Sequence, residues 1–477
     1  SGAMGRVAWS AMSEESSVGR VSGRRHTVTS NFGVSRRESH DASGFYSRFE
    51  PPVINDDDTV LPPEPVAEPF VCGDARNMHT LADGSVALVV TSPPYFAGKQ
   101  YEEELERDGV PASYLEYLDL LHGVLAECVR VLEPGGRIAV NVANLGRKPY
   151  RSLAADVIHI LQDQLGLLLR GEIVWQKGAG ASGSCAWGSF RSPSNPVLRD
   201  VTERVLVASK GRFQRALSPD ERRQRGLPHE PTIATEDFMA LTLDVWQTPS
   251  ESARRVGHPA PFPVELPEKL IELYTFAGDL VLDPFMGSGS TLVAASRTNR
   301  RYVGYDLDQG YVELAMARVD DEGHPPLAEP ERLTGSKERI ARVLSEAGFE
   351  TEGPNVRIKG SGMMVHEVAT DTAGGRWVIE LGGPFLRHRG GLTSVDAVWR
   401  TLGRAHTLRG LDERVLVLTS DLPKRRSEFD VAIRAAGPQA LFDVIDVFDD
   451  DALERLAAYA SGTTDQLPGF WNPPDLT

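Results

Sequence analysis

The apolar positions of this chain change period repeatedly, from runs typical of buried strands to spacings typical of helices. Residues 86–90 form an unbroken apolar run, as expected of a strand that is buried on both faces. The segment 111–132 carries leucine and valine at intervals of three and four residues, which predicts a helix that ends before the Pro-Gly-Gly at 134–136. The same patterns predict strands at 138–142 and 171–175 and a helix at 150–165.

A second stretch repeats this alternation around a glycine-rich loop. The pattern predicts a helix at 265–276, a strand at 280–282, a loop at 283–291, a helix at 291–298 and a strand at 302–305. A strand, a loop, a helix and another strand in this order indicate a doubly wound α/β sheet of the Rossmann type.

Two segments lack this periodicity and divide the chain. Residues 5–68 are rich in Ser, Arg, Gly, Asp and Pro, which is typical of a disordered arm. Residues 177–256 are rich in Gly, Ser, Arg and Pro and show little regular pattern. We therefore expect an arm (1–68), a first α/β part (69–176), an irregular insert (177–256), a second α/β part (257–325), and a linker with a small C-terminal α/β domain (326–477).

Charge and composition narrow the class of protein. No apolar run reaches the ~18 residues of a membrane span, and no signal segment opens the chain. The three cysteines are far apart, which fits neither a disulfide framework nor a zinc site. We therefore expect a cytoplasmic protein without a metal site.

The net charge of −16 argues mildly against nucleic-acid binding, but such binding needs only a local basic patch. Between positions 204 and 225, seven Lys or Arg residues stand against two acidic ones. This segment is either a solvated loop or a strip that follows phosphates. The candidates for phosphate contact are Arg204, Lys210, Arg212, Arg222, Arg223 and Arg225.

The loop at 283–291 has the features of a ligand site. Gly287 and Gly289 flank one residue directly after a strand and before a helix, where torsions and close approach to a ligand favour glycine. Asp306, at the end of the following strand, can accept both hydroxyls of a ribose. The chain has neither a nucleoside-triphosphate loop nor a dinucleotide fingerprint here, and a plain tight turn is the alternative.

A second cluster follows the apolar run at 86–90. Pro93 and Pro94 stiffen the backbone just beyond the predicted strand. Ser92 and Tyr95 project one polar and one aromatic side chain from this stiff loop. An ordinary proline turn with a packed tyrosine is the alternative.

The segments 91–95 (Thr-Ser-Pro-Pro-Tyr) and 283–291 (Asp-Pro-Phe-Met-Gly-Ser-Gly-Ser-Thr) resemble the catalytic and cofactor motifs of the DNA methyltransferases that modify amino groups. The catalytic motif precedes the cofactor motif, as in the permuted β group of that family. The segments 72–75, 172–177 and 257–263 fit as well, so the resemblance covers roughly 69–320.

This resemblance implies S-adenosylmethionine as cofactor and double-stranded DNA as substrate, on the bacterial nucleoid, with residues 177–256 as the target-recognition region. Ser92 and the Pro93 carbonyl would accept the two amino hydrogens of a flipped base, on which Tyr95 would stack. The implied cofactor-binding residues are Asp74 for the adenine, Asp306 for the ribose, and Asp283, Pro284, Phe285, Gly287, Ser288, Gly289 and Phe262 around them.

The target base is less constrained. A serine at position 92 is typical of the N4-cytosine enzymes, so we favour cytosine N4, with adenine N6 as the alternative. A methyltransferase acting on RNA or protein is a competing class, although protein-glutamine enzymes lack a basic insert like residues 177–256. The recognition sequence and a homodimeric state stay open.

The C-terminal region carries its own pattern. A helix at 336–347, strands at 363–369 and 376–381, a helix at 394–407 and a strand at 415–419 resemble the core of the restriction-endonuclease-like fold. Glu367 or Asp371 would be the first acid and Glu380 the second, but Gly382 stands where that family has a lysine. We therefore expect a degenerate nuclease-like or assembly domain that does not cleave DNA. A plain α/β module and a fused restriction–modification enzyme are the alternatives.

Overall fold

The computed structural model describes residues 53–62, 64–94, 113–144, 150–177, 188–198, 201–248, 263–322, 336–383, 390–463 and 465–471. Most of the predicted N-terminal arm, 1–68, lies outside the described residues. Its last part is described and rests on the protein without forming a helix or strand, since the Asn55 amide donates to the Gly211 carbonyl at 2.9 Å.

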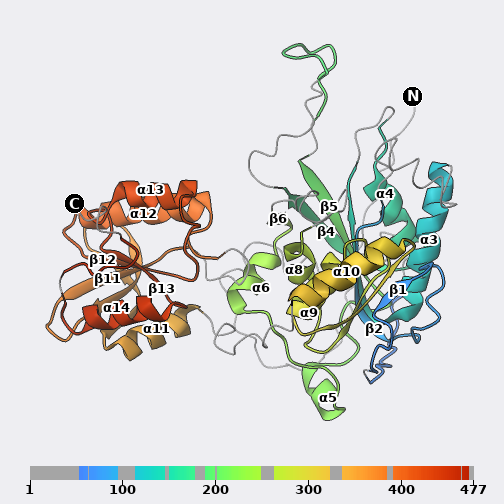
Figure 1. Ribbon diagram of the computed structural model, residues 1–477, viewed down its shortest axis with the longest axis horizontal. Coiled ribbons are helices and arrows are strands. Elements are labelled where there is room, and N and C mark those ends of the chain that lie inside the picture. The colour runs from blue at the N-terminus through green and yellow to red at the C-terminus, as the bar shows by residue number, and fades with distance from the viewer. Residues whose placement is uncertain are drawn as a thin grey trace, which may run out of the picture. The chain divides into compact units, whose positions relative to one another are not determined.

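The predicted doubly wound sheet is present (Figure 1). It has eight strands in the order β1-β8-β7-β2-β3-β5-β4-β6. Five neighbours run parallel, namely β1 (Phe70–Cys72), β8 (Arg301–Asp306), β7 (Leu280–Asp283), β2 (Val86–Thr91) and β3 (Leu132–Val142). Then β5 (Thr202–Ser209) is antiparallel to both β3 and β4 (Leu168–Gln176), and the short β6 (Val245–Gln247) is parallel to β4. We call the edge where the five parallel strands end the carboxyl edge, and the opposite one the amino edge.

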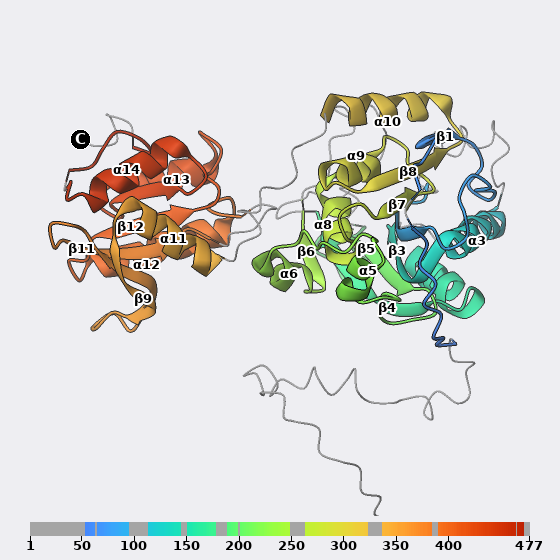
Figure 2. The ribbon, with the colours of Figure 1, turned by 90° about the horizontal axis from the view of Figure 1, so that it is seen from below.

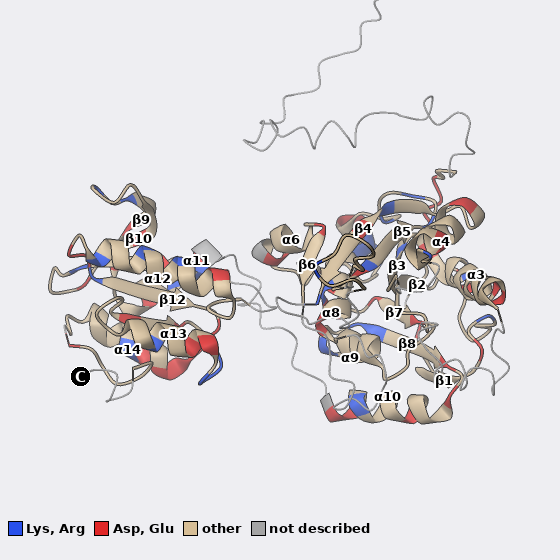
Figure 3. Ribbon diagram, turned by 90° about the horizontal axis from the view of Figure 1, so that it is seen from above, with Lys and Arg blue, Asp and Glu red and all other residues tan. Residues whose placement is uncertain are grey.

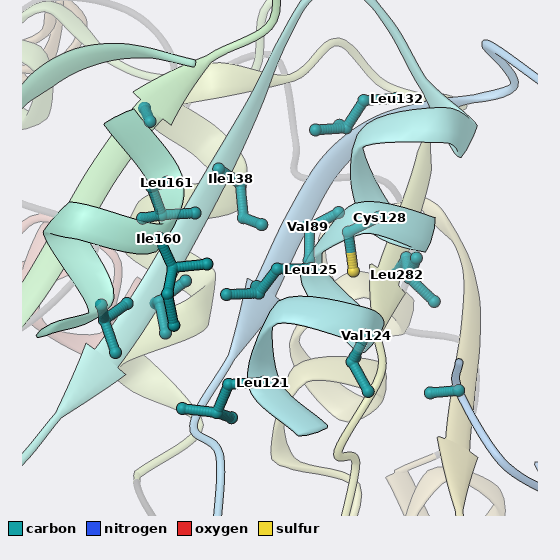
Figure 4. Close-up of a cluster of buried hydrophobic side chains, with 14 of the residues drawn as sticks. Val89, Leu121, Val124, Leu125, Cys128, Leu132, Ile138, Ile160, Leu161 and Leu282 are labelled. Atoms are coloured by element: carbon teal, nitrogen blue, oxygen red, sulfur yellow. The ribbon is translucent and has the colours of Figure 1, made fainter. Parts of the chain in front are cut away.

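Helices cover both faces of this sheet because its strands are apolar on both sides. Val89 faces a cluster built with α3 (Tyr114–Val131) and α4 (Leu153–Ile158), which Figure 4 shows from within. Leu88 and Val90 face the opposite cluster, built with α8 (Glu265–Tyr274), α9 (Ser290–Arg297) and α10 (Gln309–Glu322) (Figure 2). This two-faced burial is why residues 86–90 read as one continuous apolar run.

Two local expectations differ from the structure. The helix predicted at 111–132 is α3, which begins after Ser113 with a capping box to Glu116. The strand predicted at 138–142 is β3, which begins earlier, at Leu132, and therefore includes the Pro-Gly-Gly at 134–136. Gly135 adopts φ +75, and a Cβ there would lie 2.0 Å from the Gln214 carbonyl oxygen. The helix predicted at 150–165 is α4 followed by a π-helix, His159–Gln164.

The segment 177–256 is more regular than its composition indicated. It contains β5, whose residues Val205–Ser209 are all buried in the middle of the sheet, together with α5 (Pro219–Gln224), α6 (Thr235–Leu241) and β6. The expectation of little regular structure was therefore wrong, because polar flanks on both sides conceal a strand that pairs with β3 and β4.

The C-terminal domain has a five-stranded sheet in the order β13-β12-β11-β10-β9. The predicted elements correspond to α11 (Ser336–Ala347), β10 (Met364–Thr370), β11 (Arg376–Leu381), α12 (Val395–Arg409) and β12 (Val415–Thr419). The structure adds β9 (Glu350–Arg357), α13 (Glu428–Ala436), β13 (Asp443–Asp446) and α14 (Asp450–Ala460). The largely exposed β9 escaped the sequence pattern because it has no buried alternating face.

Helices lie on both faces of this second sheet, with α11 and α14 over one cluster of buried side chains and α12 and α13 beside the other. Acidic positions gather at the start of α14 (Figure 3). Among the described residues of the whole chain, no helix is long and apolar enough to cross a membrane.

Candidate active site

The predicted site residues meet along the carboxyl edge. Because β1, β8, β7 and β2 are parallel neighbours, the residues that follow their ends lie side by side in that order. Asp74 comes just after β1, Asp306 ends β8, the glycine loop follows β7, and Ser92 follows β2. The topology thus lines up the proposed adenine, ribose, methionine and target-base contacts in one row.

Asp306 is held at the centre of this row by backbone amides. Its carboxylate accepts hydrogen bonds from the amides of Gly287 at 3.0 Å and Asp308 at 2.9 Å. Burial, reinforced by the negative charge of Asp308, raises the pKa of Asp306. The Gly73 amide donates to the Asp306 carbonyl at 2.9 Å, which brings the start of the Asp74 loop beside this carboxylate.

Asp74 itself is already engaged. Its carboxylate accepts from Arg76 Nη2 at 2.6 Å and Nε at 2.9 Å. The Arg76 hydrogen bonds hold the pKa of Asp74 below its usual range, so this acid is charged at neutral pH. An adenine contact by Asp74 stays a prediction.

Asp283 lies beneath the site rather than in it. Its side chain is fully buried, and its two carboxylate oxygens accept from the hydroxyls of Thr91 and Thr291, each at 2.7 Å. Burial raises the pKa of Asp283 to about 6 in spite of these bonds. Asp283 therefore ties the end of β2 to the start of α9, and both of its oxygens are occupied by protein donors.

Two further loop residues contact α10. A Cβ at Gly289, where φ is +79, would lie 2.7 Å from the Ala315 Cβ, so this glycine permits close helix packing. The Ser288 hydroxyl accepts from Arg318 Nη1 at 2.9 Å. For these residues the structure shows contacts with α10 where the sequence predicted contacts with the cofactor.

The remaining positions predicted to surround the cofactor are Gly287, Pro284, Phe285 and Phe262. Gly287 adopts φ +46, in the left-handed region that favours glycine. Pro284 is buried, and the half-buried Phe285 packs against the cluster on the α3 face. Phe262, predicted to lie nearby, is outside the described residues.

The predicted catalytic loop, residues 91–95, is described up to Pro94, so Tyr95 lies outside the described residues. Tyr117 of α3 donates to the Pro94 carbonyl at 2.9 Å, which fixes the loop on the helix face. The Ser92 hydroxyl is half-buried and lies 3.4 Å from Asn141 Nδ2. Pro93, which separates Ser92 from Pro94, is buried.

The predicted DNA-contacting residues are not gathered at this edge. β5 is antiparallel to β3, with Arg204 opposite Val142 at the end of β3 and Ser209 opposite Arg137 further back along that strand, so the chain leaves β5 toward the amino edge. Lys210 donates there to the carbonyls of Arg130 and Leu132. Of the six candidates only Arg204, opposite Val142 on β3, lies toward the carboxyl edge.

For Arg222 the prediction of a phosphate contact is wrong. Its side chain is only 1% exposed and pairs with Asp279 at 3.0 Å and Glu133 at 3.4 Å. Arg212 donates to the Asp57 carbonyl at 2.6 Å, whereas Arg223 and Arg225 are exposed on and after α5. The basic segment 210–225 is therefore attached to the edge opposite Ser92, largely through the buried ion pairs of its arginines.

Several functional candidates escaped the sequence analysis. Thr91 is the first residue of one recognised motif and Thr291 the last residue of the other, but only the fold shows that both donate to Asp283. Asn141 interrupts the apolar run of β3 near its end, and that polar interruption was the available signal. Glu203 gave no signal, because its partner lies 62 positions earlier in the chain.

These residues suit S-adenosylmethionine. The half-buried Asp306 carboxyl group supplies the acceptors that a ribose diol requires, and the left-handed Gly287 leaves the loop without a side chain at its turn. Asp74 and Asp306 thus place two carboxyl groups at this edge, next to the glycine loop. Among the described residues, no group of three or more His, Cys, Asp or Glu side chains is arranged to hold a metal ion.

Comparisons with known proteins agree with this geometry. Residues 86–317 match the family described as DNA methylase, with N6 and N4 members. The chain is 30% identical to the type II methyltransferase M.MthZI of Methanothermobacter thermautotrophicus over 271 residues, which cover 52% of this chain and 75% of that protein. It is 28% identical to M.MjaI of Methanocaldococcus jannaschii, covering 52% and 90% of the two chains.

Among solved structures, a Thermus thermophilus protein in complex with S-adenosyl-L-methionine, titled as a DNA modification methylase, is 30% identical, with a TM-score of 0.40. The alignment covers 54% of this chain and 93% of that one. The resemblance inferred from the two motifs is confirmed at the level of the family: this chain belongs to the N6/N4 DNA methylases, enzymes that use S-adenosylmethionine as methyl donor.

Proposed function

We propose that this protein transfers the methyl group of S-adenosylmethionine to the exocyclic amine of a base flipped out of double-stranded DNA, with N4 of cytosine as the target. The main support is the row of Asp74, Asp306, the glycine loop and Ser92 along the carboxyl edge. A cofactor that lies along this row has its nucleoside end at β1 and β8 and its reactive end beside the catalytic loop.

The chemistry requires help for a poor nucleophile. The lone pair of an aromatic amine is delocalised into the ring, and accepting both amino hydrogens draws the nitrogen toward tetrahedral geometry. Ser92 and the Pro93 carbonyl are the proposed acceptors, and Tyr95 is the proposed stacking partner of the flipped base. S-adenosylmethionine supplies the activated methyl, so the protein acts mainly by positioning.

The choice of base rests on Ser92, which is typical of N4-cytosine enzymes in this family. Adenine N6 is the alternative, since an amine on either base offers two hydrogens to the same acceptors. No contact among the described residues distinguishes the two bases.

The DNA-facing surface is proposed at the carboxyl edge. β4 ends at Gln176 and β5 begins at Thr202, so the segment between them leaves and re-enters the sheet at this edge. Its described part includes the exposed Arg191, and Arg204 follows at the start of β5. We therefore place target recognition in residues 177–201, a smaller part of the predicted region 177–256.

The test is direct. The full chain is incubated with mixed-sequence DNA and isotope-labelled S-adenosylmethionine, and the DNA is digested to nucleosides for mass spectrometry. We expect labelled N4-methylcytosine, and Ser92→Ala should lose it while still binding the cofactor in calorimetry. Labelled N6-methyladenine would correct the base, and label in added RNA or protein but not in DNA would overturn the proposed function.

A further inference from the structure

We propose that Asn141, Glu203 and Lys177 form a positioning network that orients the Ser92 hydroxyl toward the target amine. This inference rests on the proposed role of Ser92 and extends the catalytic apparatus beyond the loop at 92–95. None of the three residues belongs to either recognised motif.

The network crosses four neighbouring strands. Ser92 follows β2, Asn141 lies near the end of β3, Glu203 lies near the start of β5, and Lys177 follows β4. The sheet order β2-β3-β5-β4 and the antiparallel direction of β5 bring all four to the carboxyl edge. In the sequence, by contrast, Ser92 and Glu203 are far apart.

The contacts form a chain that ends at Ser92. Lys177 Nζ forms an ion pair with Glu203 Oε1. Asn141 Nδ2 donates to Glu203 Oε2 at 2.5 Å and approaches Ser92 Oγ at 3.4 Å. The Lys177 ammonium also lies 5.5 Å from the centre of the buried Trp175 ring, which limits its movement.

The carboxylate determines which way the Asn141 amide faces. An ionised glutamate only accepts hydrogen bonds, so the amide must turn its NH2 group toward Glu203. The same NH2 group carries a second hydrogen, and that hydrogen is directed at Ser92 Oγ. Glu203 thus acts on Ser92 through the orientation of Asn141.

The effect on Ser92 follows from the chemistry of a hydroxyl, which has one hydrogen and two lone pairs. A donor at one lone pair restricts the rotation of the hydroxyl and leaves the other lone pair for an amino hydrogen of the base. An amide does not pass on a proton, so Glu203 is not a remote base. The network orients Ser92 and does not remove the proton of the methylated amine.

Burial argues that the network has a function other than stability. Asn141 is 3% exposed and Glu203 is 6% exposed. A buried ion pair contributes little net stability, because desolvation offsets much of the attraction between its charges. The network lies in an apolar sheet beside the predicted catalytic serine, so its function is best explained as the orientation of that serine.

The kinetic test uses three variants. Asn141→Ala and Glu203→Leu should lower kcat about tenfold to a hundredfold, as expected when a catalytic group is misplaced, with affinity for S-adenosylmethionine within about twofold of the original. Glu203→Gln keeps an acceptor oxygen for Asn141, so kcat should be partly retained. Because glutamine has the same shape as glutamate, Glu203→Gln still tests the network if the other two variants fold poorly.

Glu133→Gln is the matched control. Glu133 is also a buried, ion-paired glutamate, but it lies at the start of β3, on the amino edge. This variant should lower the melting temperature while kcat per folded molecule stays unchanged. If Glu133→Gln lowered kcat as much as Glu203→Gln did, or if Asn141→Ala turned over normally, the positioning role would be overturned.

A crystal structure of Glu203→Leu separates this proposal from the proposed function, because it needs no activity. We expect a turned Asn141 amide and a changed or disordered Ser92 rotamer. An unchanged Ser92 would overturn the network even in an active methyltransferase. If Ser92 moves in this variant but the original protein methylates no DNA, the network is supported and the proposed function is refuted.

Discussion

The Thr91 hydroxyl donates to Asp283 Oδ1 at 2.7 Å, across 192 positions of sequence. Thr91 is the last residue of β2, directly before Ser92, and Asp283 is the last residue of β7, directly before the glycine loop. The other Asp283 oxygen accepts from Thr291 in α9. One buried carboxyl group therefore fixes the proposed catalytic loop and the glycine loop to each other.

The buried Asp283 should make the stability of the protein depend on pH. Its pKa is raised from 3.8 to about 6, so folding favours the protonated form, and this contribution to stability is lost as pH rises from about 4 through 6. The loss amounts to about 3 kcal/mol, because one pKa unit corresponds to about 1.4 kcal/mol.

Asp283→Asn keeps the shape and removes the ionisation. Urea unfolding of both proteins is measured between pH 4 and 7. Over this interval the unfolding free energy of the variant should rise by about 3 kcal/mol relative to that of the original protein. A stability difference that stays constant with pH would mean that Asp283 is not protonated on folding.

The buried arginine of α5 should matter for stability and not for DNA. Arg222→Ala leaves Glu133 and Asp279 with only Arg215, and it should lower the unfolding free energy by about 3–5 kcal/mol. The control Arg223→Ala removes an exposed pair with Asp220 and should change stability by less than about 1 kcal/mol.

Neither α5 variant should alter how DNA affinity depends on salt, because α5 is anchored at the edge opposite Ser92. Each lost phosphate contact lowers the log–log slope by about 0.9. If the slope fell by that amount in Arg223→Ala while the fold stayed intact, α5 would have to contact DNA phosphates after all.

Gly289→Ala should disturb the contact between the cofactor loop and α10. The new methyl group meets Ala315 Cβ at 2.7 Å, whereas Gly84, also left-handed at φ +70, has no atom within 4 Å of the position that a Cβ would take. Both changes carry the left-handed strain of about 1–2 kcal/mol, and only Gly289→Ala adds about 1–3 kcal/mol of overpacking.

Cofactor calorimetry should distinguish the two glycines further. We expect weaker S-adenosylmethionine binding in Gly289→Ala and unchanged binding in Gly84→Ala. Equal stability losses together with equal affinities would show that α10 yields to the added methyl group without moving the loop.

The C-terminal domain should not cleave DNA. Glu380 is bound by Arg404 at 2.6 and 3.0 Å, and Asp371 accepts from Trp377 Nε1 and from backbone amides of its own turn. Burial raises the pKa of Glu380, although Arg404 opposes this shift. These acids therefore serve the domain itself, and Gly382 supplies no cation to activate water.

Purified protein with Mg²⁺ or Mn²⁺ and unmethylated DNA should leave the DNA intact on a gel. Specific cutting by the original protein that disappears in Glu380→Ala would make the chain a fused restriction–modification enzyme. If the DNA stays intact, DNA binding or assembly is the role left for the domain, as expected from its sequence.

The family and the elements that carry its motifs could be inferred from the amino-acid sequence alone. The runs at 86–90 and 280–282 and the glycine loop were recognisable because each depends on local chemistry: apolar strands, left-handed turns and free helix amides. The parallel sheet followed from the repeated strand–helix–strand order. Asp306 could be predicted as a site residue from its position at the end of a strand, and Ser92 from the resemblance of its loop to the catalytic motif of the family.

The fold, in contrast, was needed to show which residues are neighbours and which edge of the sheet they occupy. The antiparallel β5 carries Glu203 toward Ser92 and sends Arg222 to the opposite edge, although both belong to the predicted target-recognition region 177–256. The row from Asp74 through Asp306 to Ser92 likewise follows strand order in the sheet and not order in the chain. Strand pairing joins residues that are far apart in the sequence, so local sequence patterns do not predict it.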